Sequence, residues 1–204
     1  MRLLAIDTSG EACSVALFDG AKLIDARHET IGRGHAERLV PMIADLPENG
    51  RSDRIMVSLG PGSFTGVRIG LAAARALGVA WNASVAGYPT LSLIAAIAQA
   101  EVSGPADICM NGGHGEWFVQ SFDSSGLPIT EVQSRRPEEA ARELTAAFVA
   151  GNRAAEFAQI SGRQIRSLEV VADARFVSAI PAPLKTSALS PIYGRAPDAK
   201  APGQ

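Results

Sequence analysis

Two short segments of the chain carry residue types that can handle phosphate or a metal-bound water. In the first, Asp7-Thr8-Ser9, the carboxylate could order a metal-bound water and the two hydroxyls could donate hydrogen bonds to phosphate. The same residues also suit a hairpin turn, in which the side chains of Asp7 and Ser9 bond to nearby backbone groups. Spacing alone leaves both interpretations open.

The second segment is a glycine-rich turn, Gly60 to Gly70, that leads directly into a helical pattern. Backbone N–H groups and the positive dipole end at such a helix start can hold an anion. The residues placed to do so are Gly60, Gly62, Ser63 and Thr65. The segment lacks the Gly-Lys-Ser/Thr of a Walker A loop. Alternatively, the glycines supply unusual backbone angles and Ser63 or Thr65 caps the helix.

The histidines and cysteines show no metal-binding or nucleophilic pattern. His35 is followed four residues later by Leu39, so no facing histidine pair is available on that helix. Cys13 and Cys109 have no Cys-x-x-Cys spacing and are expected to be reduced, buried hydrophobes. Ser63 lacks the Gly-x-Ser-x-Gly context of a nucleophile elbow. We therefore expect neither a metal site nor a covalent catalyst.

The elements that must position these residues are expected in the order βββαβαβα. Strands are expected over residues 2–7, 14–18, 22–29, 54–59 and 84–86, and helices over 34–46, 64–81 and 90–100. A meander followed by alternating helix and strand is typical of the ribonuclease-H-like half of the actin and sugar-kinase (ASKHA) folds. The pattern predicts an α/β, actin-like fold.

A change of composition after the first hundred residues predicts two lobes and a tail. Ser103-Gly104-Pro105 has the composition of a linker, and strand-like segments follow it. We place the first lobe at residues 1–102, a reduced second lobe at 103–181, and an extended, partly disordered, proline-rich tail at 182–204.

Both early helices of the first lobe carry more apolar surface than one sheet needs. The apolar positions are Leu39, Val40, Met42 and Ile43 in the shorter helix, and Phe64, Val67, Ile69, Leu71, Ala73, Ala74, Ala76 and Leu77 in the longer one. A surface helix needs one stripe against its own sheet, so a second stripe suits a partner helix. The alternative is that both helices are wholly internal.

The overall charge and the N-terminal segment predict a cytoplasmic protein that does not bind nucleic acid strongly by itself. The net charge of −2 leaves no excess of Lys and Arg to neutralise a row of phosphates, which disfavours direct, strong nucleic-acid binding. The apolar run at the N-terminus, Leu3 to Ile6, is too short for a signal-peptide core or a membrane span.

Three motifs of this sequence together resemble the TsaB family, also called YeaZ. They are Leu4-Ala5-Ile6-Asp7-Thr8, the segment from His35 to Met42, and the run from Gly60 to Gly70. They cover the first hundred residues in the order found in that family, and the run of eleven residues is very specific. The second lobe is less similar, because Asn111-Gly112-Gly113 stands where the family usually has Asp-Ala-Arg.

The resemblance implies a non-catalytic, actin-like subunit of the system that modifies tRNA with threonylcarbamoyl. Such a subunit supports the catalytic subunit TsaD, which transfers threonylcarbamoyl to the adenosine beside the anticodon, and meets the ATPase TsaE through the complex. It needs no cofactor of its own, since ATP and threonylcarbamoyl adenylate are handled by the wider complex, and it meets tRNA only indirectly. The resemblance leaves open whether the free chain forms a homodimer.

The resemblance also implies that the first two helices contact TsaD. The residues expected at this interface are His35, Leu39, Met42, Ile43, Phe64, Val67, Arg68, Ile69, Leu71 and Ala73. The alternative hypothesis is a stand-alone enzyme of the wider family, either a peptidase or a small ATP-dependent kinase. We disfavour it because the sequence shows no assembled set of acid, base, nucleophile or metal ligands.

Overall fold

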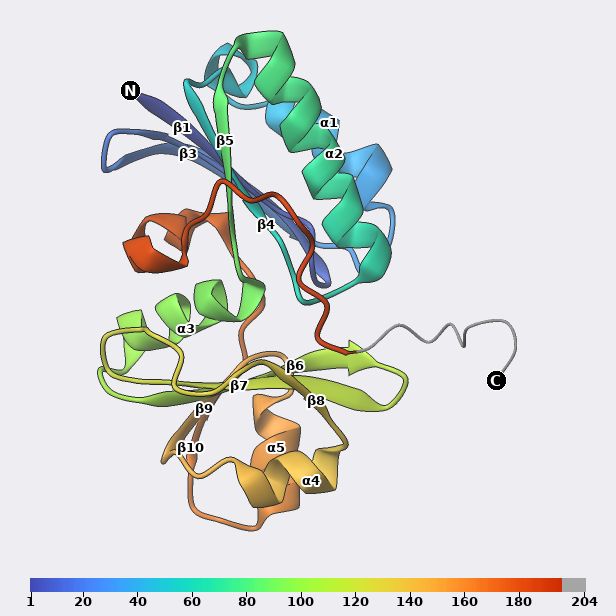
Figure 1. The fold of residues 1–204 in the computed structure, drawn as a ribbon, viewed down its shortest axis with the longest axis vertical. Coiled ribbons are helices and arrows are strands. Elements are labelled where there is room, and N and C mark those ends of the chain that lie inside the picture. Colours follow the sequence, from blue (N-terminus) through green and yellow to red (C-terminus); the bar gives the residue numbers. More distant parts are fainter. Residues whose placement is uncertain (196–204) are drawn as a thin grey trace.

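The computed structural model describes residues 1–195, which form two sheets of five strands each (Figure 1). The first part of the chain follows the predicted order βββαβαβα. Its elements are β1 (Arg2–Asp7), β2 (Ala12–Asp19), β3 (Lys22–Thr30), α1 (His35–Ala44), the 3-10 turn η1 (Pro47–Gly50), β4 (Arg54–Ser58), α2 (Phe64–Trp81), β5 (Ser84–Tyr88) and α3 (Thr90–Glu101). The first sheet has the strand order β3-β2-β1-β4-β5, antiparallel within the meander and parallel from β1 through β4 to β5. The prediction of an α/β, actin-like fold is confirmed.

The first sheet is covered on both faces, which explains why its central strands read as continuous apolar runs. In β2, Val15 and Leu17 point to the face that α1 and α2 cover. The alternating residues Ala16 and Phe18 point to the opposite face, which packs against α3 and a later 3-10 segment. Successive side chains of β2 therefore point alternately into two different cores, and neither face of the strand is exposed to solvent.

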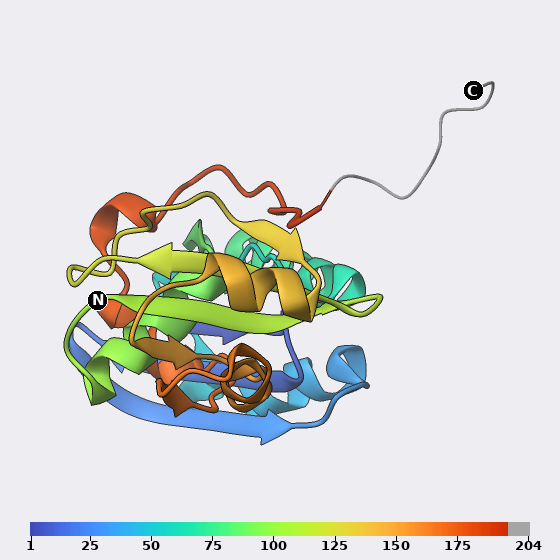
Figure 2. The same cartoon turned by 90° about the horizontal axis from the view of Figure 1, so that it is seen from below.

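The second sheet forms the lower half of Figure 1. Its elements are β6 (Ala106–Gly113), β7 (Glu116–Phe122), β8 (Gln133–Arg135), α4 (Pro137–Glu143), β9 (Phe148–Ala150), α5 (Ala154–Ser161) and β10 (Arg166–Leu168), in the strand order β10-β9-β6-β7-β8. Figure 2 looks at the molecule from the side of α4 and α5, which pack on the outer face of this sheet. The sequence did not predict α5, because Phe157 and Ile160 are its two large apolar residues and define no extended stripe.

Helix α3 lies between the two sheets and is buried from Thr90 to Ala98. Leu93 and Ile97 pack into the core under the first sheet. Leu91 and Ile94 pack into the core of the second sheet. A helix that is apolar all round is expected to be internal, and α3 is the shared layer of the two lobes.

After β10 the chain returns to the first sheet. The 3-10 segment η2 (Ala174–Ala179) packs against β1, β2 and β3, and η3 (Ala182–Leu184) follows it. Residues 186–195, called here the strap, then run past β5, β4 and α2 to the β6–β7 hairpin (red in Figure 1). The lobe boundaries proposed at residues 102 and 181 stay predictions, although η2 belongs spatially to the first lobe. Of the tail predicted at 182–204, residues 196–204 lie outside the described residues.

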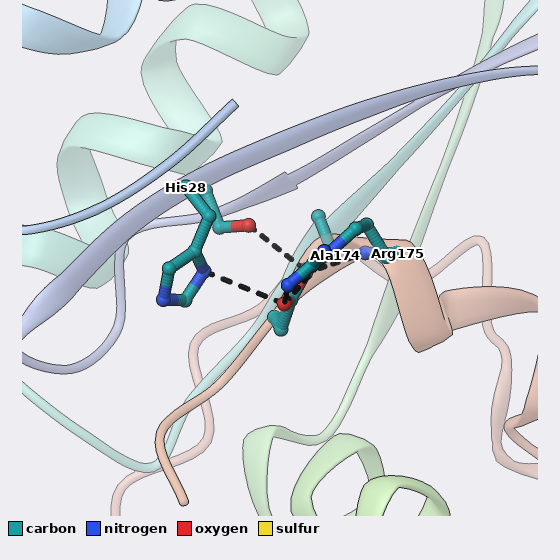
Figure 3. A network of polar contacts seen from close by, with 5 residues as sticks. His28, Ala174 and Arg175 are labelled. Atoms are coloured by element: carbon teal, nitrogen blue, oxygen red, sulfur yellow. Dashed lines mark hydrogen bonds and ion pairs between the residues drawn. The ribbon is translucent and has the colours of Figure 1, made fainter. Parts of the chain in front are cut away.

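A small polar network fastens η2 to the first sheet (Figure 3). The backbone N–H of Ala174 donates to the hydroxyl of Ser14 on β2, at 2.9 Å. Next to it, Asp173 caps η2 by accepting from the backbone N–H of Arg175, and His28 on β3 places its Nδ1 3.7 Å from the Asp173 carboxylate. Burial raises the pKa of Asp173, but its hydrogen bonds with Arg175 lower that pKa more, so the carboxylate is held ionised.

No helix among residues 1–195 combines the length and the apolar character that crossing a bilayer requires.

Candidate functional site

A cleft of about 920 Å³ opens between the two lobes. Its first-lobe wall is made by the turn after β1 and the start of α2, and its second-lobe wall by the β6–β7 hairpin. The strap closes one side through its last residues, Pro191 to Arg195. The size falls in the range of small-molecule sites, so the cleft is the place to test the predicted phosphate-handling residues.

Asp7 lies behind the wall of this cleft and is fully buried. Its Oδ1 accepts hydrogen bonds from the backbone N–H and the hydroxyl of Ser9, at 2.9 and 2.7 Å. Its Oδ2 accepts from the hydroxyl of Tyr88 at 3.1 Å. Burial raises the pKa of Asp7, and these hydrogen bonds oppose the rise. Both carboxylate oxygens are therefore engaged by the fold, as the hairpin-turn interpretation expected.

The start of α2 is pressed against the turn after β1, and glycines make this approach possible. A Cβ atom at Gly66 would lie 2.1 Å from the carbonyl oxygen of Thr8, and one at Gly62 would lie 2.2 Å from that of Ser9. The hydroxyl of Thr8 donates to the carbonyl of Gly66 at 2.7 Å, and the backbone N–H of Ser63 donates to the carbonyl of Ser9 at 2.7 Å. The Thr8 hydroxyl and the Ser63 backbone N–H, two donors that could have bound phosphate, are therefore already hydrogen-bonded within the protein.

The predicted loop residues therefore divide into two groups. Ser9, Gly62 and Ser63 line the cleft. Thr8 and Gly60 are buried, and Thr65 is exposed on α2. Ser63 also caps the helix, because its hydroxyl accepts from the backbone N–H of Gly66 at 3.2 Å. The unusual backbone angle expected at both glycines is found at Gly60, which adopts a φ of 93°, but not at Gly62, whose φ is not positive. Anion or nucleotide binding at these loops stays a prediction.

The rim of the cleft carries an arginine held between two aromatic rings, called here the Arg68 stack. The guanidinium carbon of Arg68 lies 3.2 Å from the ring centroid of Phe64 and 5.8 Å from that of Tyr193. Its Nη2 donates to the Tyr193 hydroxyl at 2.9 Å. The sequence placed Phe64 and Arg68 on one helix but gave no reason to bring Tyr193 to them, because 125 positions separate it from Arg68.

The predicted interface residues of α1 are internal, which corrects the expectation of a wide apolar surface there. His35, Leu39, Met42 and Ile43 are 6%, 1%, 0% and 4% exposed, and the latter three belong to the core under the first sheet. His35 is within 3.2 Å of the carbonyl of Ala12 through its Nε2. The stripe that the sequence assigned to a partner is the stripe that holds α1 on β2.

Helix α2 presents both a buried and an open side. Val67 and Leu71 face the core, which corrects the expectation that they contact a partner. Ile69 and Ala73 are half-buried, and Phe64 and Arg68 are exposed. The large apolar side chains that α1 and α2 leave open are Val40, Phe64 and Val79, at 62%, 66% and 86% exposure. The sequence analysis counted Val40 among the apolar positions of the first helix, but it placed neither Val40 nor Val79 among the expected interface residues, because helical spacing does not show which stripe the sheet covers.

The region also lacks the side chains that would hold a metal ion. Among residues 1–195, no three His, Cys, Asp or Glu side chains gather closely enough to share a cation. The cysteines Cys13 and Cys109 are buried, and burial raises the pKa of Cys13 to about 11. A thiol with so high a pKa is protonated at neutral pH and a poor nucleophile.

Comparison with known proteins places this architecture in a family. Residues 26–191 match the family model described as "TsaD: tRNA N6-adenosine threonylcarbamoyltransferase". The TsaB proteins of Escherichia coli and Bacillus subtilis, both described as "tRNA threonylcarbamoyladenosine biosynthesis protein", are 42% and 31% identical over 100 and 103 residues. Each match covers 47% of this chain but only 43% and 44% of the relative, so the similarity spans less than half of those proteins.

The whole described fold has a match among solved structures. A structure from Pseudomonas aeruginosa, described as an uncharacterized protein with similarity to peptidase YEAZ, superposes with a TM-score of 0.81 at 27% identity and covers 95% of this chain and 99% of that one. A second, described as YeaZ from Pseudomonas aeruginosa, gives a TM-score of 0.80 at 25% identity. The chain therefore belongs to the family of the TsaD model and, within it, to the TsaB (YeaZ) group that its sequence motifs resemble.

Proposed function

We propose that the chain is a non-catalytic partner subunit that supports TsaD in transferring threonylcarbamoyl to the tRNA adenosine beside the anticodon. The observation that carries the proposal is the state of Asp7. It ends the first strand, where actin-like proteins handle phosphate and metal, and it is buried and bonded to Ser9 and Tyr88. The names of the TsaB relatives supply the pathway.

In this role the chain acts in the cytoplasm and has no cofactor of its own. ATP and threonylcarbamoyl adenylate are handled by the other subunits, the ATPase TsaE joins through the complex, and tRNA is met indirectly. The net charge of −2 supports the last point, because affinity for a phosphate backbone comes chiefly from excess Lys and Arg.

The contact with TsaD is assigned to the open side of α1 and α2. Val40, Phe64 and Val79 expose large apolar side chains there. Arg68 is already held by Phe64 and Tyr193, so little side-chain entropy remains to be lost on binding. Aromatic residues and arginine are the types most often found at the energetic centre of an interface.

Co-purification with TsaD of the same organism tests this assignment. Phe64→Glu and Val79→Glu are expected to abolish capture of TsaD. The first replaces the ring that carries Arg68 with a carboxylate that pairs with that arginine. The second buries an unpaired carboxylate in an apolar contact. Ile129→Glu is the matched control, since Ile129 is 65% exposed, nearly the same as the 66% of Phe64, but lies beyond β7. Capture of TsaD by both α2 variants at the level of the control would place the interface elsewhere.

The same variants decide whether the free chain uses this surface to form a homodimer. Size-exclusion chromatography with light scattering of the wild type and of Phe64→Glu separates two cases. If the wild type is a dimer and the variant a monomer, the two copies compete with TsaD for one surface. If both are monomers, the surface serves TsaD alone.

A further inference from the structure

The strap touches the two lobes in very different ways. Along the first lobe it is held by several contacts spread over its length: Thr186 bridges to Gly87, Ile192 donates its backbone N–H to Leu59 at 2.7 Å, and Arg75 donates to the carbonyl of Leu189 at 2.7 Å. Leu189 and Ile192 also pack against the core of that lobe. This half of the strap is part of the first lobe.

The contacts of the strap with the second lobe are concentrated in Gly194 and Arg195. The Nη2 of Arg195 donates to the carbonyl of Gly112 at 2.9 Å, and its Nη1 lies 3.7 Å from the carboxylate of Glu116. Gly194 lies flat against the ring of Phe118, where a Cβ atom would come within 2.3 Å of a ring carbon. Two adjacent residues thus fasten the strap to the β6–β7 hairpin, across the open side of the cleft.

We propose that Gly194 and Arg195 form a latch that holds the β6–β7 hairpin close to the first lobe and keeps the interlobe cleft narrow, alongside the hydrogen bond that Asn152 donates to Glu11 across the cleft at 3.0 Å. Releasing the latch costs one charge-assisted hydrogen bond, one ion pair and one ring contact, while the strap stays anchored on the first lobe. The wider cleft exposes the Phe118 ring, which is buried while the latch is in place. This inference does not depend on the proposed function.

The ion pair in the latch is partly open to water, with side chains of Arg195 and Glu116 exposed by 27% and 34%. Such a pair contributes modestly and is screened by salt. Glu116 is also held by the hydroxyl of Ser134 at 2.6 Å, so it stays in place when Arg195 leaves. The hairpin side of the latch is therefore preformed, and the strap end is the part that moves.

Distance measurement between the lobes tests the latch in the full chain. Spin labels are placed at Ala76→Cys on α2 and Glu138→Cys on α4, both exposed positions on helices. The native cysteines are buried and do not compete for the label. Pulsed electron paramagnetic resonance then reports the separation of the lobes, with excess unlabelled protein added to remove distances between copies.

In this double-cysteine background, Arg195→Ala and Gly194→Ala are each expected to shift the distance distribution toward longer values and to broaden it. The first variant removes the polar contacts, and the second forces the strap off the Phe118 ring by steric conflict. Arg163→Ala is the matched control, because Arg163 donates to the carbonyl of Leu144 at 2.8 Å within the second lobe and bridges nothing. Its distribution is expected to match that of the parent.

Circular dichroism and thermal unfolding check that each variant is folded. An unchanged distribution in both strap variants, whether narrow or broad, overturns the latch. A shift of equal size in Arg163→Ala also overturns it, because the effect would then come from general loosening of the second lobe.

Discussion

At the scale of single residues, the glycines at the start of α2 are needed because the backbone there packs against the turn after β1, and not because it must be flexible. Gly62 and Gly66 let the backbone of the helix start touch the carbonyls of Ser9 and Thr8. The sequence correctly marked this loop as special but left two reasons open. The contacts that decide between them come from the turn after β1, more than fifty positions earlier in the chain, and no local spacing can show them.

We predict that Gly66→Ala lowers the free energy of unfolding by roughly 1–3 kcal/mol, the usual cost of overpacking, because the new methyl group meets the carbonyl of Thr8 at 2.1 Å. Alanine is the better helix former by about 0.5–1 kcal/mol, so the steric term must exceed that gain. Urea denaturation measures the change. Gly10→Ala is the control, since a Cβ there meets nothing within 4 Å, and it should change stability by less than about 0.5 kcal/mol. Equal stability of the two variants would contradict the packing argument.

A second prediction concerns the pH dependence that Asp7 gives to stability. Burial raises the pKa of Asp7 in the folded protein above its pKa in the unfolded chain, so the folded state binds the proton more readily. The folded state therefore gains stability as the pH falls from above the raised pKa toward the pKa of the unfolded carboxyl. Asp7→Asn removes this term. The stability of the variant relative to the wild type should therefore be most favourable near neutral pH and should decline as pH falls through the raised pKa.

Chemical denaturation from about pH 8 to about pH 4 measures this difference. Asp25→Asn is a control of opposite sign. The hydrogen bond from Arg27 lowers the pKa of the half-buried Asp25 carboxyl, so the difference between that variant and the wild type should shrink as pH falls. Parallel curves for wild type and Asp7→Asn would show that the folded and unfolded pKa values of Asp7 coincide.

At the scale of elements, the sequence predicted the order of the first lobe and the limits of α2, but not which helix stripe is covered. Helical periodicity shows that Leu39, Met42 and Ile43 share one side of α1. It does not show that β2 lies against that side, because this depends on how the sheet folds around the helix. The α1 residues predicted to contact a partner are therefore the residues that pack into the core of the chain itself.

Neighbouring positions on α1 make this distinction measurable. Leu39→Glu is expected to unfold the first lobe, because Leu39 is 1% exposed and an unpaired buried carboxylate costs several kcal/mol. Val40→Glu, at a side chain that is 62% exposed, should change the free energy of unfolding by less than about 0.5 kcal/mol. Thermal unfolding followed by circular dichroism gives both values. Similar melting temperatures for the two variants would mean that α1 is not packed as described.

At the scale of the whole molecule, the cleft, the strap and the latch join segments that lie far apart in the sequence. Ser9, Phe64, Gly112 and Tyr193 all line the same cavity. Each belongs to a segment whose own pattern indicates a turn, a helix start, a hairpin or an extended tail. Their meeting is a product of chain topology, so sequence patterns marked Ser9, Gly62 and Ser63, which line the cleft, but did not predict the rest of its wall or the strap.

This arrangement predicts that the purified chain alone neither hydrolyses ATP nor cleaves peptides. Asp7 is fully buried, is not among the residues that line the cleft, and has both carboxylate oxygens hydrogen-bonded, to Ser9 and to Tyr88. Phosphate release and a fluorogenic peptide assay should stay at the level of buffer. Turnover by the isolated chain that Asp7→Ala abolishes would support the enzyme hypothesis instead.

The position of α3 has a consequence for how the protein unfolds. One side of α3 packs into the core under the first sheet and the opposite side packs into the core of the second sheet. If either lobe unfolds, α3 is lost and apolar residues in the core of the other lobe become exposed to water. Heating should consequently melt the molecule in a single calorimetric transition, with van't Hoff and calorimetric enthalpies equal. For the same reason, a fragment cut behind Val102 would expose Leu91 and Ile94 to water and should aggregate rather than behave as an independent module.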